Sequence, residues 1–176
     1  MKYAALLRGV NVGGRNKLPM KDLAAMFSAA GCSDVVTFIQ SGNVVFTAPK
    51  LLVKTLSAQI AAKISESFGH KVPVILRSAD EVEQTLHNNP FPGAPEKMLA
   101  VAFLADSPAA AAVASLDPNR SPGDQFHVIG REVYLHLLNG FAATKLTNAW
   151  LDSKLFTVST ARNWTTVNKL CQLLRA

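Results

Sequence analysis

The sequence predicts an α+β protein made of two halves, each a small sheet with helices on one face. Short β-rich runs alternate with amphipathic helical patterns in the order β-α-β-β-α-β, and the same order returns in the second half of the chain. A proline-rich segment, residues 90–95, lies between the halves and suits neither helix nor strand. The 176 residues are 49% hydrophobic and 17% charged, so we expect a packed globular core.

In the first half, prolines and glycines with clear backbone preferences mark where helices begin and end and where the chain turns. Pro19 suits the first position of a helix, and Gly31 ends the helical spacing of apolar residues that follows it. Ser41-Gly42 suits a tight hairpin turn, because glycine accepts a positive φ. The predicted elements are a strand over residues 2–8, a helix from Pro19 to Gly31, strands over Asp34–Ile39 and Asn43–Thr47, a helix over about Lys50–Phe68 and a strand over Val72–Arg77.

This order of elements is that of the split-βαβ, ferredoxin-like (βαββαβ) plait, a four-stranded antiparallel sheet with two helices on one face. A further helix should follow the fourth strand, because Ser78 and Glu81 have the spacing of a capping box. We therefore predict one ferredoxin-like half over residues 1–89, with its connecting helix, a linker over residues 90–95, and a second half over residues 96–176 with an extra C-terminal helix.

The second half repeats the same order of strands and helices. Ser107 is expected to cap a helix that begins at Pro108. In the hairpin, His127, Tyr134 and His136 share one face, which we expect to be solvated rather than to bind a metal. The predicted elements are strands over Met98–Leu104, Gln125–Ile129 and Glu132–Leu137, a helix over about Lys145–Leu155, a strand over Phe156–Ser159 and a helix from about Asn163.

Composition and charge narrow the setting. No apolar stretch approaches the roughly 20 residues of a membrane span, and Arg8 interrupts the first apolar run, so we expect a cytoplasmic protein with no membrane contact. Cys32 and Cys171 lie far apart among apolar helical residues, which indicates buried reduced thiols. Residues 1–21 carry five cations and no acid, and residues 131–176 carry six cations against two acids, so folded together these segments would attract an anion.

The loop Gly9–Leu18 connects the first strand to the first helix. Its glycines can expose backbone N–H groups as an anion-binding nest, with Arg8, Arg15 and Lys17 supplying positive charge. The spacing imitates a P-loop, but Arg15-Asn16 stands where Lys-Ser/Thr is needed, and this disfavours an NTPase. A glycine turn without a ligand is the alternative interpretation.

Two more polar motifs are candidates for the same site. In the Gln40–Asn43 turn the amide side chains could hydrogen-bond a base or sugar, although hairpin chemistry alone would also explain them. A third group lies near the starts of two short helices, where free N–H groups favour anions, although Thr147 and Thr160 could equally be caps and Trp164 is better explained as a core anchor. The candidate ligand-binding residues are Arg8, Asn11, Gly13, Gly14, Arg15, Lys17, Gln40, Asn43, Lys145, Thr147, Asn148, Arg162 and Asn163.

These motifs resemble a known family. The segments Leu6-Leu7-Arg8-Gly9-Val10-Asn11-Val12-Gly13-Gly14-Arg15-Asn16-Lys17, Gln40-Ser41-Gly42-Asn43-Val44-Val45-Phe46, Thr144-Lys145-Leu146-Thr147-Asn148 and Thr160-Ala161-Arg162-Asn163-Trp164 are similar to the bacterial family catalogued as domain of unknown function 1697. The resemblance implies a pair of plait-like halves. It implies no activity, so it assigns no catalytic residue.

The polar motifs contain no Asp, Glu, His or Cys, so they lack a general base and a metal-binding set, and we expect neither a metal nor a cofactor. Our leading hypothesis is a protein that binds a phosphorylated small molecule, a nucleotide or a nucleic-acid backbone at the junction of its halves. The alternatives are an enzyme that stabilises an anionic substrate through Arg8, Lys17, Lys145 and Arg162, and a purely structural role for these motifs. Only Tyr3 and Phe46 could stack bases on the first sheet, which disfavours binding of single-stranded RNA there. The sequence carries no signal for a particular oligomeric state.

Overall fold

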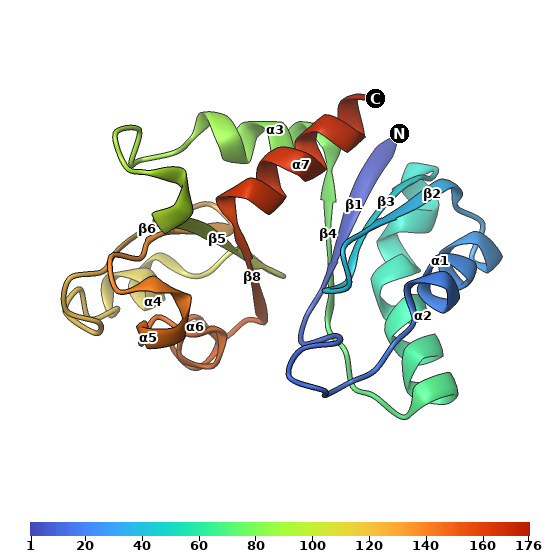
Figure 1. Ribbon diagram of the computed structural model, residues 1–176, viewed down its shortest axis with the longest axis horizontal. Coiled ribbons are helices and arrows are strands. Elements are labelled where there is room, and N and C mark those ends of the chain that lie inside the picture. The colour runs from blue at the N-terminus through green and yellow to red at the C-terminus, as the bar shows by residue number, and fades with distance from the viewer. The chain divides into compact units, whose positions relative to one another are not determined.

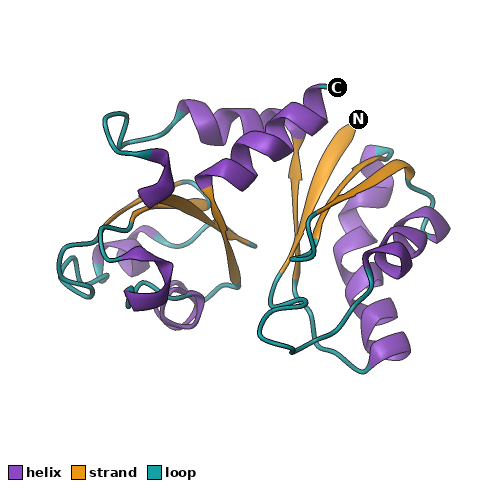
Figure 2. Cartoon of the chain, in the orientation of Figure 1, coloured by secondary structure: helices purple, strands orange, loops and turns teal.

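The computed structural model describes residues 1–176, which form two compact units. Unit 1 contains Met1–Glu83 and Leu170–Ala176, and unit 2 contains Gln84–Lys169. Each unit has one four-stranded sheet in which every pair of neighbouring strands is antiparallel (Figures 1 and 2). The protein is therefore α+β, as the alternation of strand and helix patterns predicts. The domain boundaries at residues 89 and 96 stay a prediction.

Unit 1 has the strand order β2-β3-β1-β4, with α1 and α2 packed on one face of the sheet (Figure 1). The strand β1 is central, so it is buried on both faces. Tyr3, Ala5 and Leu7 face the helices, whereas Ala4 and Leu6 face the other side. The elements of this unit are β1 (Lys2–Leu7), α1 (Met20–Ala29), β2 (Ser33–Phe38), β3 (Asn43–Thr47), α2 (Lys50–Phe68) and β4 (Val74–Ser78).

Unit 2 has the strand order β6-β7-β5-β8, which corresponds position by position to that of unit 1. Its core packs Ala100, Ala102 and Leu104 of the central strand against Trp150 and Leu151 of a helix. The elements of this unit are the 3₁₀ turn Glu96–Met98, β5 (Leu99–Leu104), α4 (Ala110–Ala114), β6 (Gln125–Ile129), β7 (Glu132–His136), α5 (Gly140–Ala143), α6 (Asn148–Leu155) and β8 (Ser159–Asn163).

Two helices, α3 (Ala79–His87) and α7 (Trp164–Arg175), each follow the last strand of a sheet and cross the boundary between the compact units. The predicted capping box opens α3: the Ser78 N–H donates to the Glu81 carboxylate at 2.7 Å, and the Glu81 N–H donates to the Ser78 hydroxyl at 3.2 Å. Just before these helices lie Arg77 and Arg162, both buried, and Nη1 of each donates to the carbonyl of the residue before it. The repeat therefore extends to single residues.

Three predicted elements of unit 2 are wrong in their bounds. The helix expected over about Lys145–Leu155 begins at Asn148, after the Thr147 cap. The helix expected from Pro108 with a Ser107 cap is only Ala110–Ala114 and has no side-chain cap. The strand expected over Phe156–Ser159 is Ser159–Asn163. The strand cannot begin at Phe156, because Phe156 is the left-handed C-cap of α6 with a φ of 54°. The helix cannot begin at Pro108, because the next residue, Ala109, is extended with a ψ of 143°.

We expect the hairpin face with His127, Tyr134 and His136 to be solvated, and this is wrong for Tyr134 and for His136, which is half-buried. The Tyr134 side chain is buried, and its hydroxyl donates to the Thr85 carbonyl of α3 at 2.8 Å. Burial and the Glu132 carboxylate raise the pKa of Tyr134. A helix from another part of the chain covers this face, which strand periodicity cannot reveal. None of the helices combines the length and the apolar character needed to span a bilayer.

Candidate functional site

The middle of the loop between β1 and α1 is a tight two-residue turn. Val12 and Arg15 form an antiparallel bridge, and the Arg15 N–H donates to the Val12 carbonyl at 3.0 Å. Gly13 and Gly14 lie between them with φ of 58° and 73°, the pair of positive values that a type I′ turn requires. A Cβ at either glycine would meet nothing within 4 Å, so the tip is open around its backbone. Glycine is needed here for its φ rather than for lack of space.

The side chain of Asn11 fixes this loop to the rest of unit 1. Its Nδ2 donates to the Leu18 carbonyl and to the Gln40 carbonyl, both at 2.8 Å, and its Oδ1 accepts from the Leu18 N–H at 2.8 Å. Asn11 has a φ of 55°, which asparagine tolerates better than most residues. One amide therefore joins both ends of the loop to the Gln40–Asn43 turn, and two motifs that are 29 residues apart come together.

The Gln40–Asn43 turn closes against β1. Gly42 has a φ of 80°, and a Cβ there would lie 2.7 Å from the Leu7 Cβ, so no larger residue fits without movement. Asn43 is fully buried, and its Nδ2 donates to the Phe38 carbonyl at 3.2 Å and the Ser41 hydroxyl at 3.3 Å. Gln40 is exposed. Of the two amides named from the sequence, Asn43 supports the turn and Gln40 faces solvent.

The charges of this loop are all positive. Arg15 and Lys17 are exposed and make no ion pair, and Arg8 is half-buried. The structure adds His70, whose Nε2 lies 3.1 Å from the Lys17 carbonyl and whose ring stacks on Phe68. Sequence reasoning missed His70, because 53 residues separate it from Lys17 and no local pattern marks it.

In unit 2 the motif around Lys145–Asn148 leads into α6. Thr147 is the N-cap of this helix, since its hydroxyl accepts from the Trp150 N–H at 3.2 Å, so the cap interpretation is confirmed. The Asn148 Oδ1 accepts from the Ser159 hydroxyl at 3.1 Å, and Asp152 accepts from that hydroxyl and from the Ser159 N–H. These bonds tie α6 to β8.

A buried network that the sequence did not reveal holds the same motif. The Asp124 carboxylate accepts from the Ser121 hydroxyl at 2.8 Å and the Asn139 N–H at 3.0 Å, and the Ser121 hydroxyl accepts from the Lys145 N–H at 3.0 Å. Burial acts to raise the pKa of Asp124, but hydrogen bonds from Asn139, Thr144 and Ser121 outweigh it and hold that pKa below its ordinary value of 3.8. The Lys145–Asn148 motif contains no acidic residue, but in the fold it is hydrogen-bonded through Ser121 to the Asp124 carboxylate.

The remaining candidates lie at the end of β8. Arg162 is 8% exposed, its Nη1 donates to the Thr160 hydroxyl and the Ala161 carbonyl, both at 2.9 Å, and burial lowers its pKa to about 10. Thr160 lies within the strand and is not a helix cap. The Asn163 Oδ1 accepts from the Thr166 N–H at 2.8 Å, the pattern of an N-cap for α7. Trp164 is buried, which confirms it as a core residue.

These arrangements differ in what they offer a ligand. In unit 1, cations and backbone N–H groups are exposed on a loop that is held in place by internal hydrogen bonds. In unit 2, Thr147, Asn148 and Asn163 already use their side-chain oxygens as acceptors within the fold, and of that group Lys145 remains as the exposed cation. The chemistry available on unit 1 is electrostatic attraction and hydrogen-bond donation to an anion.

Comparison with known proteins identifies a family and a similar fold. The family model described as "Protein of unknown function (DUF1697)" matches residues 1–134. A solved structure, that of the conserved bacterial protein SP0830 from Streptococcus pneumoniae, is 23% identical in sequence and superposes with a TM-score of 0.75, over 99% of this chain and 98% of that one. No curated protein matches. The match over most of its length shows that the chain belongs to the DUF1697 family.

Proposed function

We propose that the protein binds a phosphorylated or otherwise anionic ligand, a nucleotide or a nucleic-acid backbone, through the loop Gly9–Leu18 of unit 1. The observation that supports this most is the combination of an Asn11-anchored loop with exposed, unpaired Arg15 and Lys17. Surface cations that serve only solubility do not need a loop built from three positive-φ glycines, Gly9, Gly13 and Gly14.

The Asn11 hydrogen bonds contribute to affinity by reducing the entropic cost of binding. A loop that is already ordered loses little conformational freedom when a ligand arrives. The open backbone at Gly13 and Gly14 lets a phosphate approach the N–H groups, and Arg15 and Lys17 add attraction that is screened over about 8 Å at physiological salt. The acid-free sequence of residues 1–21 leaves no carboxylate of the loop itself to oppose the ligand.

The test is a comparison of two charge-matched double variants. Arg15→Gln with Lys17→Gln should weaken binding of inorganic pyrophosphate, measured by isothermal titration calorimetry, by about tenfold or more, a loss equivalent to two charge-assisted contacts. Lys50→Gln with Lys54→Gln removes the same charge from exposed positions on α2 and should change the affinity little. Equal losses in the two variants would reduce the effect to net charge and contradict the proposal.

The class of ligand can be separated by salt. Binding of a single-stranded oligothymidylate should weaken with a log–log slope of about −0.7 for each phosphate that the protein neutralises. The quantity to compare is the slope of the logarithm of the binding constant against the logarithm of the salt concentration. If the natural ligand is a polymer, this slope should be steeper for the oligonucleotide than for pyrophosphate. If the loop holds a single phosphate group, the two slopes should be equal.

The expected contributions of Lys145, Thr147, Asn148, Arg162 and Asn163 remain part of the proposal. Lys145→Gln is the informative variant, because Lys145 is exposed and its side chain is not part of the network formed by Ser121 and Asp124. Unchanged affinity for pyrophosphate would restrict the site to unit 1.

We further propose that each unit is a ferredoxin-like plait and that the protein acts in the bacterial cytoplasm. The strand orders β2-β3-β1-β4 and β6-β7-β5-β8, antiparallel throughout, support the first proposal. The buried unpaired thiols of Cys32 and Cys171 and the bacterial origin of the similar structure support the second.

A further inference from the structure

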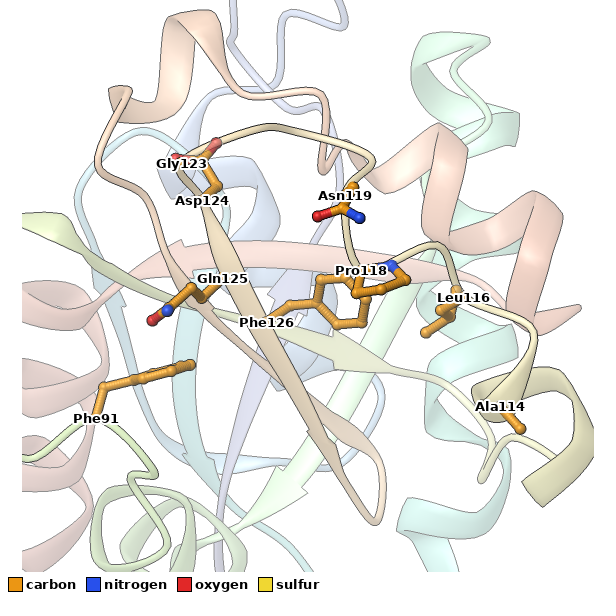
Figure 3. Close-up of a pocket in the computed structure, with 9 residues that line it drawn as sticks. All are labelled: Phe91, Ala114, Leu116, Pro118, Asn119, Gly123, Asp124, Gln125 and Phe126. Carbon is orange, nitrogen blue, oxygen red and sulfur yellow. The ribbon is translucent and has the colours of Figure 1, made fainter.

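Unit 2 contains an open pocket beside β6, the edge strand of its sheet, with a volume of about 750 Å³. This volume falls within the range of roughly 300–1,000 Å³ typical of small-molecule sites. Figure 3 shows Phe91 and Gln125 on one side, Asn119 and Pro118 on the other, and Phe126 between them. All the residues that line the pocket belong to unit 2, and none of them belongs to the loop Gly9–Leu18.

Aromatic and aliphatic side chains form the walls. Phe126 packs edge-on against the buried Trp150 ring at 5.9 Å between ring centroids, and this contact supports the Phe126 ring. Phe91 comes from the proline-rich segment and packs against the His136 ring at 5.4 Å. Leu116 and Pro118 complete the apolar surface. A flat ligand can contact ring faces here at low entropic cost, because both rings are backed by other side chains.

The polar groups at the pocket are amides and a carboxylate. The Asn119 side chain is exposed and makes no hydrogen bond, so it can donate and accept. The Gln125 Oε1 lies 3.4 Å from the His136 Nδ1. Asp124, which also lines the pocket, accepts hydrogen bonds from Ser121 and Asn139 that stabilise its ionised form.

An unpartnered buried nitrogen adjoins these groups. The His136 Nε2 is buried and has no hydrogen-bond partner. His136 does not line the pocket, but it contacts Phe91 and Gln125, which both do. If the Gln125 Oε1 accepts from Nδ1–H, its amide nitrogen stays available as a donor at the pocket, while Nε2 carries a lone pair without a donor.

We propose that this pocket is a second ligand site, for a planar nitrogen heterocycle that is neutral or cationic and carries N–H donors. The Phe91 and Phe126 rings contact its faces, and the Asn119 and Gln125 amides pair with its edge. The charge of the buried Asp124 carboxylate, whose oxygens accept from Ser121 and Asn139 within the fold, favours a neutral or cationic ligand. The same carboxylate repels anions, so the site differs in kind from the cationic loop and does not depend on the function proposed for that loop.

The experiment is a titration of the ¹⁵N-labelled full chain, followed by NMR, with adenine, cytosine and, as a planar anion of similar size, benzoate. We expect saturable shifts of the Asn119 and Gln125 amide signals with at least one of the two bases and none with benzoate. Phe91→Ala should weaken that binding by about fivefold, the loss of one aromatic contact. Phe141→Ala removes an aromatic ring that is 48% exposed and outside the pocket, and it should leave the affinity unchanged.

A second variant protects the test against misfolding. Asn119→Ala changes an exposed side chain without hydrogen bonds, so the protein should keep its melting temperature while losing affinity for the base. The proposal is overturned if neither base causes saturable shifts at the pocket, if benzoate binds there as well as the bases, or if both Phe91→Ala and Asn119→Ala bind like the wild type. Binding of pyrophosphate to unit 1 is measured separately, so either proposal can fail alone.

Discussion

Asn11 shows how much one side chain can determine in this fold. Three hydrogen bonds from a single amide join the two ends of the loop and a turn that lies far away in sequence. The sequence marks Asn11 as polar and loop-bound but not as an internal support, because the pairing with Gln40 depends on how β1 and β3 lie side by side. The cations of the loop are recognisable from the sequence as candidate anion-binding residues, because their charge does not depend on a partner elsewhere in the fold.

Asn11→Ala should lower the free energy of unfolding by about 1–3 kcal/mol, because it leaves the Leu18 N–H and two carbonyls without their side-chain partner. Chemical denaturation followed by circular dichroism measures this change. Asn11→Gly is the matched control, since it accepts the φ of 55° but also lacks the amide. If the glycine variant is as stable as the wild type, backbone strain rather than hydrogen bonding explains any loss in the alanine variant.

At the level of elements, helical spacing, strand composition and capping motifs predicted those elements whose bounds depend on neighbouring residues in the sequence. The Lys50–Phe68 helix and the Asn43–Thr47 strand have the predicted bounds, and the Ser78–Glu81 capping box forms as its spacing indicates. Predictions failed at the start of α4, where Ala109 is extended, and at the start of β8, where Phe156 takes the left-handed C-cap conformation of α6. Local propensity is a weak guide to the backbone conformation of such single residues.

The Asp124 network joins two loops of unit 2 and should make their stability depend on pH. The folded protein holds the pKa of Asp124 below 3.8, so its ionised form stabilises the fold above that pH. This stabilisation is lost as the pH falls below 3.8 toward the lowered folded-state pKa. Asp124→Asn should therefore be less stable than the wild type by about 1–3 kcal/mol at pH 7, and the difference should narrow as the pH falls below 3.8.

Thermal unfolding of both proteins between pH 7 and pH 2.5 measures this difference. Ser115→Ala is a useful control because its hydroxyl bonds only within α4 and carries no charge, so the gap between it and the wild type should not vary with pH. A gap for Asp124→Asn that stays constant down to pH 2.5 would show that the carboxylate charge does not stabilise the loops.

At the scale of the whole molecule, the repeated order of elements was visible in the sequence and the repeated strand order is visible in the structure. The end of α7 could not be assigned to unit 1 from the sequence, because Leu170–Ala176 is separated from the rest of that unit by all of unit 2. The chemistry near these motifs also depends on residues outside them. The motifs themselves contain no acid and no histidine. In the fold, however, His70 contacts the Lys17 carbonyl of the loop in unit 1, and the Ser121 hydroxyl connects Asp124 to the Lys145 N–H.

The positive charge of the chain, +6 overall, is concentrated at its two ends, and the loop Gly9–Leu18 presents part of it without a balancing acid. A ¹⁵N NMR titration of the full chain with inorganic pyrophosphate, at low and at physiological salt, tests this most directly. We predict saturable shifts confined to the backbone N–H signals of Gly13, Gly14, Arg15 and their neighbours, with affinity that falls as salt rises. Shifts spread evenly over the exposed lysines, or none at the Gly13-Gly14 turn, would contradict anion binding by this loop.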